Sequence, residues 1–223
     1  MPSFAAQDQQ DPSLCWQRGE CVIETKSFDL ALPVVLTGAV VSFTVANDAR
    51  SSGMVDLPPW KQLPFDPGAR NDLYILEGEL IDNAGPAYAS GTFIRASANG
   101  TFTAGAGGAR LFAYRDRSAP SADYAVVKPG QLDWHRGGTP GMKVASLAGG
   151  GHSLMLVSWL CGTRMRFHLH PEGEEIFVLK GELQDQGGHY PAGTWQRFHP
   201  GTGHAPYAET YTLILLRNGH LRD

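Results

Sequence analysis

The chain has little charge of either sign, few cysteines and no long apolar run. Its 223 residues carry 18 Lys and Arg against 22 Asp and Glu, a formal net charge of −4. Because there is no basic stripe, we do not expect nucleic acid as a partner. The three cysteines, Cys15, Cys21 and Cys161, are too few for a disulfide framework and favour a reducing compartment. Cys15 and Cys21 are close enough in sequence to form a redox pair, but ordinary thiols are the simpler interpretation.

Targeting and membrane segments are also missing from the pattern. The opening residues 1–11 are polar and lack the charged-then-apolar order of a signal peptide. The most apolar stretch, residues 30–45, is shorter than the roughly 20 residues of a membrane-spanning helix and contains Pro33 and Gly38. Two strands around a turn at Thr37-Gly38 explain this stretch better. We therefore predict a cytoplasmic protein that does not contact a membrane.

Glycine and proline are abundant, with 27 and 15 residues, and they separate short β-branched or aromatic runs. No stretch sustains an apolar helical period, so the pattern predicts an all-β sandwich or barrel fold. The chain also repeats itself once. The repeat is carried by three aligned pairs of segments: 73–80 with 176–183, 89–95 with 191–197, and 111–115 with 213–217. A repeat of this length predicts two tandem domains, residues 1–117 and 118–223, joined by a linker near residues 116–123.

All eight histidines follow residue 134, so only the second copy has imidazoles. His168 and His170 are alternate residues, which share one face of a strand and can aim at one point. A tight reversal at residues 171–173 leads to Glu174, at the start of an apolar strand where an unpaired carboxylate would be costly. Glu174 has the same parity as the apolar residues at 176 and 178, so we expect all three to point inward.

A fourth metal ligand has to come from elsewhere in the second copy. His204 follows the return strand and is the best candidate, while His199 lies within the strand before the turn and is the alternative. Three imidazoles and one carboxylate suit Zn, Fe, Mn, Ni or Cu rather than the hard ions Ca and Mg. The residues thus predict one divalent transition metal in the second copy.

Residues 162–181 fit the pattern G-x5-H-x-H-x3-E-x6-G, which resembles the first motif of the cupin superfamily. That resemblance implies two tandem cupin barrels of the RmlC-like jelly-roll type. It also implies metal binding by His168, His170, Glu174 and His204. The second cupin motif is met loosely. Residues 191–206 are instead similar to the cupin domain of ChrR-type anti-sigma factors, which holds zinc, so zinc is the first choice, with Fe(II), Mn or Ni as alternatives.

The first copy keeps the scaffold without the ligands. The internal alignment places Phe65, Pro67, Asn71 and Phe102 where the second copy has its three histidines and Glu174. None of these side chains can replace a metal-binding group, so a structural or dimerising role is predicted for residues 1–117. Sheet edges in such a tandem protein favour a homodimer.

Other side chains of the second copy have two interpretations each. His189 is a loop residue or a gate over the barrel mouth. Arg166 has the parity of His168 and is a surface residue or a cavity cation for an anionic substrate. Simpler roles are expected for five further residues: core for Phe177 and Trp195, and surface for His135, His152 and His220.

Two functions follow from the resemblance. A ChrR-like protein would regulate an extracytoplasmic-function sigma factor in oxidative stress. However, the first 134 residues lack the histidines of the ChrR sigma-binding domain. The alternative is a metalloenzyme acting on a small organic molecule, such as an Fe-dependent dioxygenase of the acetylacetone or dihydroxyacetophenone type, or an isomerase. An open pocket beside the metal favours the enzyme, and a site sealed by aromatic residues favours the regulator.

Overall fold

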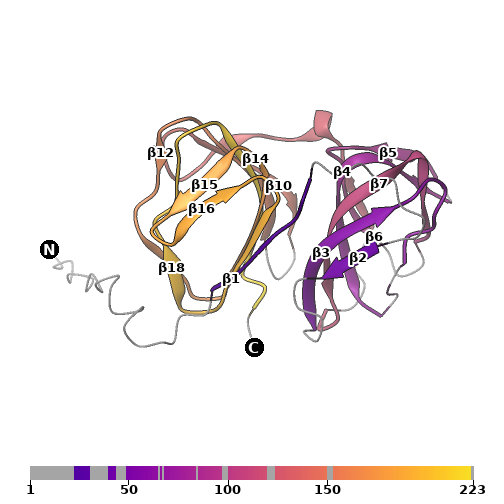
Figure 1. Cartoon of the computed structure of the whole chain (residues 1–223), viewed down its shortest axis with the longest axis horizontal. Coiled ribbons are helices and arrows are strands. Elements are labelled where there is room, and N and C mark those ends of the chain that lie inside the picture. Colours follow the sequence, from indigo (N-terminus) through magenta and orange to yellow (C-terminus); the bar gives the residue numbers. More distant parts are fainter. Residues whose placement is uncertain are drawn as a thin grey trace, which may run out of the picture.

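The computed structural model describes residues 23–30, 40–43, 49–64, 66, 68–83, 85–96, 100–119, 124–149 and 153–221. These residues form strands and turns with one short 3-10 helix at Pro129–Gln131, which confirms the all-β class. Two halves lie side by side, one built mainly from the earlier and one from the later part of the chain (Figure 1). Among the described residues there is no helix long and apolar enough to cross a membrane.

The first half is one seven-stranded antiparallel sheet. Its strands, in spatial order, are β2 (Val40–Phe43), β3 (Arg50–Leu57), β7 (Phe102–Asp116), β4 (Arg70–Asp82), β6 (Phe93–Ala96) and β8 (Ala125–Val127), with β5 (Ala87–Ala89) paired to β4. The pairing of β4 with β7 shifts register twice, between Ile75 and Glu77 and between Gly78 and Leu80. Such irregularities bend strands, so the sheet curls around its own apolar core.

The second half has a large seven-stranded sheet and two smaller sheets. The large sheet contains β1 (Ile23–Ser27), β17 (Thr194–Phe198), β14 (Glu174–Lys180), β20 (Thr212–Asn218), β11 (Ser153–Trp159), β10 (Met142–Ala148) and β9 (His135–Arg136). The smaller sheets contain β12 (Thr163–Arg164), β19 (Tyr207–Ala208), β15 (Glu182–Asp185) and β16 (Gly188–Pro191), and the pair β13 (His168–His170) and β18 (Thr202–His204).

Strand β14 shows how the large sheet divides its side chains between two faces. Ile176 and Val178 join a core cluster with Leu183 of β15 and Ala208 of β19, inside the second half. Phe177, between them in sequence, joins a different cluster on the opposite face. The predicted inward parity of Ile176 and Val178 is therefore confirmed, and it follows from the two-residue period of a strand.

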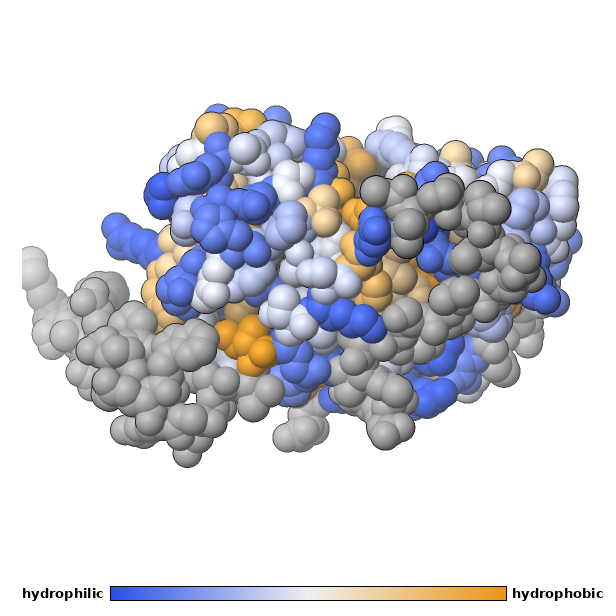
Figure 2. Space-filling view, in the orientation of Figure 1, coloured by the Kyte–Doolittle hydropathy of each residue, from blue (hydrophilic) through white to orange (hydrophobic). Residues whose placement is uncertain are grey.

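The outer face of the large sheet packs against the first half. Phe177 stacks on Phe112 of β7 with ring centroids 4.0 Å apart, and Trp195 lies in the same cluster. Both Phe177 and Trp195 are almost fully buried, which confirms them as core residues. In Figure 2, hydrophobic residues are visible near the junction of the two halves, whereas hydrophilic side chains cover much of the second half.

A buried ionic network also joins the halves. Glu175 of β14 is fully buried and accepts hydrogen bonds from Arg197 Nε at 2.7 Å and from Ser52 Oγ of the first half at 2.8 Å. Arg217 of β20 is also fully buried and lies 3.0 Å from Asp116 of β7. His220 is 4 % exposed and lies 3.5 Å from Glu175, so its predicted surface position is wrong. The imidazole lies beside the Glu175 carboxylate, on the face of β14 opposite to Glu174.

Two strands cross between the halves in opposite directions. β1 comes from the start of the chain but pairs with β17 of the second half, as the indigo strand in Figure 1 shows. β8 begins at Ala125, after the predicted linker, and pairs with β6 of the first half. Each sheet therefore includes one strand from the far side of the predicted division between residues 117 and 118. The division at residues 117 and 118 stays a prediction.

Paired glycines show the repeat in the backbone. Gly78 and Gly181 both have φ near +75°, and a Cβ atom would lie 2.2 Å from the carbonyl oxygen of Gly108 or of Tyr211, respectively. Only glycine tolerates such a close approach in this conformation. The two halves thus share one backbone conformation at these glycines, although among the described residues no sheet closes on itself and two closed barrels are not confirmed. In the stretch 30–45, one expected strand is present as β2, whereas the Thr37-Gly38 turn lies outside the described residues.

Candidate metal centre

Two short strands and the start of a third bring the predicted ligands together. β13 and β18 are antiparallel, and their register places His168 directly opposite His204. A Cβ atom at Gly203 would lie 2.3 Å from the carbonyl oxygen of His168, so glycine at this position allows the two strands to approach. After β13 the chain reverses at Gly173, whose φ is +75°, and Glu174 begins β14.

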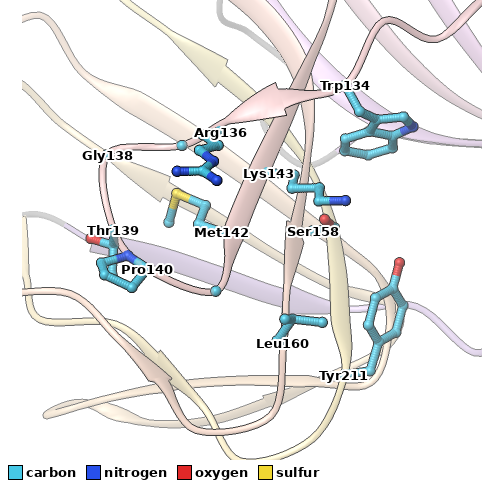
Figure 3. Close-up of a pocket in the computed structure, with 12 residues that line it drawn as sticks. Trp134, Arg136, Gly138, Thr139, Pro140, Met142, Lys143, Ser158, Leu160 and Tyr211 are labelled. Atoms are coloured by element: carbon cyan, nitrogen blue, oxygen red, sulfur yellow. The ribbon is translucent and has the colours of Figure 1, made fainter.

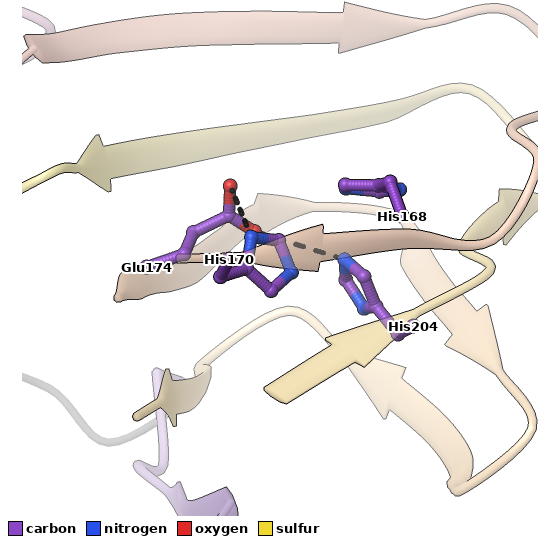
Figure 4. Close-up of side chains that lie close together, drawn as sticks. All are labelled: His168, His170, Glu174 and His204. Atoms are coloured by element: carbon purple, nitrogen blue, oxygen red, sulfur yellow. Dashed lines mark ion pairs between the residues drawn. The ribbon is translucent and has the colours of Figure 1, made fainter. Parts of the chain in front are cut away.

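The four side chains point toward one another inside the second half (Figure 4). One ligand atom from each of His168, His170, Glu174 and His204 can be chosen so that all four lie within 4.8 Å of one another. Glu174 Oε2 is 3.5 Å from His170 Nδ1, and Glu174 Oε1 is 3.7 Å from His204 Nε2. The three imidazole centroids are 4.9 to 5.0 Å apart. His199, the alternative fourth ligand, lies outside this cluster and contacts Glu24 Oε1 at 2.6 Å.

Burial favours the neutral forms of His168, His170 and Glu174 when no cation is present. Burial and then the neighbouring His204 and His168 lower the pKa of His170 to about 3. Burial also lowers the pKa of His168 and raises the pKa of Glu174 to about 8. Neutral imidazoles are the form that binds a metal, and a divalent cation would compensate the carboxylate charge.

Hydrogen bonds at the far side of two rings orient them for a cation. His204 Nδ1 lies 3.1 Å from Asp185 Oδ2, so this nitrogen donates to the carboxylate and Nε2 is left facing Glu174. His168 Nδ1 lies 3.2 Å from the carbonyl oxygen of Arg166. His170 Nε2 is buried and has no hydrogen-bond partner among the described residues. Two oriented rings and one unpartnered nitrogen fit a divalent metal ion.

Asp185 is a residue of the site that the sequence analysis did not predict. It ends β15 and also accepts hydrogen bonds from the amide of Gly187 at 2.7 Å and the hydroxyl of Tyr190 at 2.9 Å. Burial opposes ionisation, but the hydrogen bonds from His204, Gly187 and Tyr190 outweigh it and lower the pKa of Asp185. An aspartate just before the turn at Gly187-Gly188 resembles an ordinary turn residue, so sequence offers no sign of its contact with His204.

A cavity of about 360 Å³ opens beside the cluster. His168, His170, Glu174 and His204 all line it. Apolar residues form most of the remaining wall: Met142, Val144, Met155, Val157, Trp159, Met165, Leu169, Pro171, Ile176, Leu183, Pro206, Ile214 and Leu216. The other two lining residues are Glu172 and Asn218. The site is therefore reached through an open apolar pocket and is not sealed by aromatic side chains.

The other side chains singled out in the second copy lie away from this pocket. Arg166 is exposed and does not line the pocket, so it is a surface residue in this structure. His189 is also exposed, and its Nδ1 lies 3.1 Å from Glu182. His135 is exposed, as expected, beside Asp133. His152, Cys15 and Cys21 lie outside the described residues.

A larger cavity, of about 770 Å³, lies at the end of the large sheet near β9 and β10 (Figure 3). It is lined by Trp134, Tyr211, Arg136 and Lys143 among others, and no histidine, cysteine or carboxylate lines it. The candidate metal ligands therefore lie at the smaller pocket and not at the larger one.

The first half lacks an equivalent cluster among the residues that can be described. Phe102 is 1 % exposed and packs in the apolar core, where the second half places His204. Asn71 donates from its side chain to the carbonyl oxygens of Asp66 and Ala69. Phe65 and Pro67 are outside the described residues.

Comparison with known proteins agrees with this geometry. The family model for the ChrR cupin-like domain matches residues 122–222, the part of the chain that holds the cluster. The cupin resemblance is confirmed. No curated protein matches the chain.

Cupin structures resemble the chain over both halves. A provisionally assigned dioxygenase from Nostoc punctiforme has a TM-score of 0.71 at 13 % identity, covering 90 % of this chain and 84 % of its own. A cupin 2 conserved barrel domain protein from Leptotrichia buccalis has a TM-score of 0.61 at 16 % identity, covering 87 % and 95 %. Oxalate decarboxylase from Lactobacillus farciminis, in a formate complex, has a TM-score of 0.60 at 12 % identity, covering 89 % and 86 %. At these identities the likeness shows the cupin fold alone.

Proposed function

We propose that this protein is a mononuclear metal-dependent cupin enzyme that acts on a small organic molecule. The proposed ligands are His168, His170, Glu174 and His204, and the proposed catalytic region is the second half. The observation that carries the proposal is the open apolar cavity against which all four side chains lie. A bound Fe, Mn, Ni or Zn ion would supply Lewis-acid or redox chemistry at positions that the protein leaves open.

The chain's own residues prepare this site in two ways. Asp185 contacts Nδ1 of His204, and the carbonyl oxygen of Arg166 contacts Nδ1 of His168. In both rings Nε2 is then the nitrogen available to a metal ion. The apolar wall limits water around the reacting molecule, which strengthens electrostatic interactions there. No separate general acid or base is evident among the lining residues, apart from the ligands and Glu172.

Regulation of a sigma factor is the second candidate. The match of residues 122–222 to the ChrR cupin-like domain supports it, and zinc would then be the expected metal. A regulator of this kind needs a surface that grips its partner, and none of the described residues can be assigned to that role from the family. The open pocket is the reason for ranking small-molecule chemistry first.

We also propose that the two halves are tandem cupin barrels related by duplication. The sequence repeat, the matching positive φ of Gly78 and Gly181, and the coverage of both halves by cupin structures support this. The first barrel would serve as a scaffold. A homodimer remains a prediction.

Metal analysis of the purified protein tests the main proposal. We expect about one transition metal ion per wild-type chain and almost none in His170→Ala, with both proteins folded by circular dichroism. His199→Ala is the matched control and should keep its metal, because His199 lies outside the cluster. Full metal occupancy in folded His170→Ala would overturn the ligand assignment.

Two further measurements separate the candidate functions. The protein loaded anaerobically with Fe(II) is screened for oxygen uptake with β-diketones and hydroxyaryl ketones, and uptake that His170→Ala abolishes supports the enzyme. Isolation of a stable complex with a sigma factor, combined with no turnover in the screen, would reverse the order of the two candidates.

A further inference from the structure

We infer that the metal pocket takes a ligand with one oxygen-donor end and an uncharged apolar body, and that it rejects dianions such as dicarboxylates. This inference rests on the proposed function, because the donor end has to meet a metal at the four-residue cluster. It goes further by assigning the charge and polarity of the molecule that occupies the pocket.

The floor of the pocket is formed by buried apolar side chains. Val157, Trp159, Leu183 and Ile214 line it and are each at most 2 % exposed. Pro171 and Asn218 line it as well but are exposed, so they mark its mouth. A ligand that enters from this rim therefore places its body against buried hydrocarbon, where each apolar group removed from water favours binding.

Methionine is concentrated in this wall. Met142, Met155 and Met165 all line the pocket, although the whole chain has only five methionines. The unbranched thioether side chain adapts its shape to an irregular apolar partner. A volume of about 360 Å³ is within the range of pockets for small organic molecules. The wall can therefore accommodate apolar bodies of different shapes.

The pocket lining contains acidic side chains but no arginine or lysine. Outside the proposed ligands, the only ionisable lining residue is Glu172, and none of the lining residues is Arg or Lys. Strand β20 shows why, since Leu216 faces the pocket while the next residue, Arg217, turns to the opposite sheet face toward Asp116. A second carboxylate on the ligand would be desolvated without a cation and beside an acidic residue, which is strongly unfavourable.

A matched pair of probes tests the inference directly. 4-Methylbenzoate and terephthalate have the same ring and the same first carboxylate, and differ by a methyl group against a second carboxylate. Each is titrated into the full-length protein loaded with Co²⁺, and the shift of the cobalt absorption bands reports binding at the metal. We expect 4-methylbenzoate to bind about ten-fold or more tightly than terephthalate.

A charge placed in the pocket should reverse the preference. Met155→Lys puts an ammonium group on the half-buried part of the wall and should tighten terephthalate relative to 4-methylbenzoate. Leu160→Lys adds the same charge at a position that is 57 % exposed and outside this pocket, and should leave the ratio unchanged. If Met155→Lys does not fold, the ratio of the two wild-type affinities decides alone.

Three results would overturn the inference: equal affinities, tighter terephthalate binding by the wild type, or binding of neither probe to metal-loaded protein. Failure of the proposed function looks different, because Co²⁺ would then not bind at the cluster and His170→Ala would retain as much metal as the wild type. If the protein binds one metal ion per chain but binds the two probes equally well, only the proposed ligand class is refuted.

Discussion

Replacing Glu175 by alanine tests whether the buried network holds the two halves together. The carboxylate is fully buried, lies 2.6 Å from Arg197 and 4.0 Å from Arg217, and accepts a hydrogen bond from Ser52 of the first half. Burial by itself would raise the pKa of Glu175, but His220, Arg197 and Arg217 outweigh it and hold that pKa well below its usual range. The charge is therefore present, and its removal takes the close carboxylate from the fully buried Arg197, whereas Arg217 keeps Asp116 at 3.0 Å.

Removing one partner of a buried ion pair costs about 3–5 kcal/mol of unfolding free energy, and we expect Glu175→Ala to lose that amount. Chemical denaturation followed by fluorescence measures it. Glu209→Ala is the control, because Glu209 and Arg164 are both exposed and 3.7 Å apart, so its loss should stay below about 1 kcal/mol. If Glu175→Ala loses no more than Glu209→Ala, the carboxylate only offsets its own desolvation. Glu175→Gln, which keeps the side-chain shape, serves if the alanine variant does not fold.

Two further predictions concern the metal-free site and its support. In the chelated protein, a proton on Glu174 with its pKa near 8 stabilises the fold, so stability should rise by about 1 kcal/mol as the pH falls from 8 to 6.5, after protonation of histidines in the unfolded chain has offset part of the gain. Below pH 6.5 stability should fall again, because the unfolded chain protonates histidines such as His170, whose folded pKa is about 3. Glu174→Gln should remove most of the change in stability between pH 8 and 6.5. Thermal melts measure this, and an unchanged pH dependence in the variant would contradict the prediction. Asp185→Asn should weaken metal affinity about 10–100-fold in competition with a chromophoric chelator, since the hydrogen bond that orients His204 is changed. Unchanged affinity would make Asp185 a turn residue only.

The sequence predicted the local features of the site well, because these depend on short-range rules. His168 and His170 share a strand face, and Glu174 has the inward parity of Ile176 and Val178, as the two-residue period of a strand requires. His204 was selected over His199 from its place after the return strand, and the structure puts only His204 in the cluster. The sheets themselves are open, so the expected closed barrels go beyond what the strand pattern establishes.

The unpredicted features depend on partners far along the chain. His220 follows the closing strand, and its burial arises from Glu175, which lies 45 positions away and is 3.5 Å from its ring. The location of β1 is a similar case, since its short pattern fits either half and only the pairing with β17 decides. A repeat in sequence reports which segments share an ancestor, and it does not report which sheet each strand joins.

The reciprocal strands connect the first half to the proposed chemistry of the second. β1 pairs with β17, and Glu24 of β1 holds His199 at the turn that leads into β18 and His204. On β14, neighbouring glutamates have opposite tasks because a strand alternates its faces: Glu174 turns to the pocket and Glu175 to Ser52 of the first half. The half without metal ligands contacts β14 through Ser52, and it contacts β17 through the backbone carbonyl oxygen of Arg50, which accepts a hydrogen bond from Arg197 at 2.6 Å. Its loss of ligands is compatible with a continuing role as the support against which the site is built.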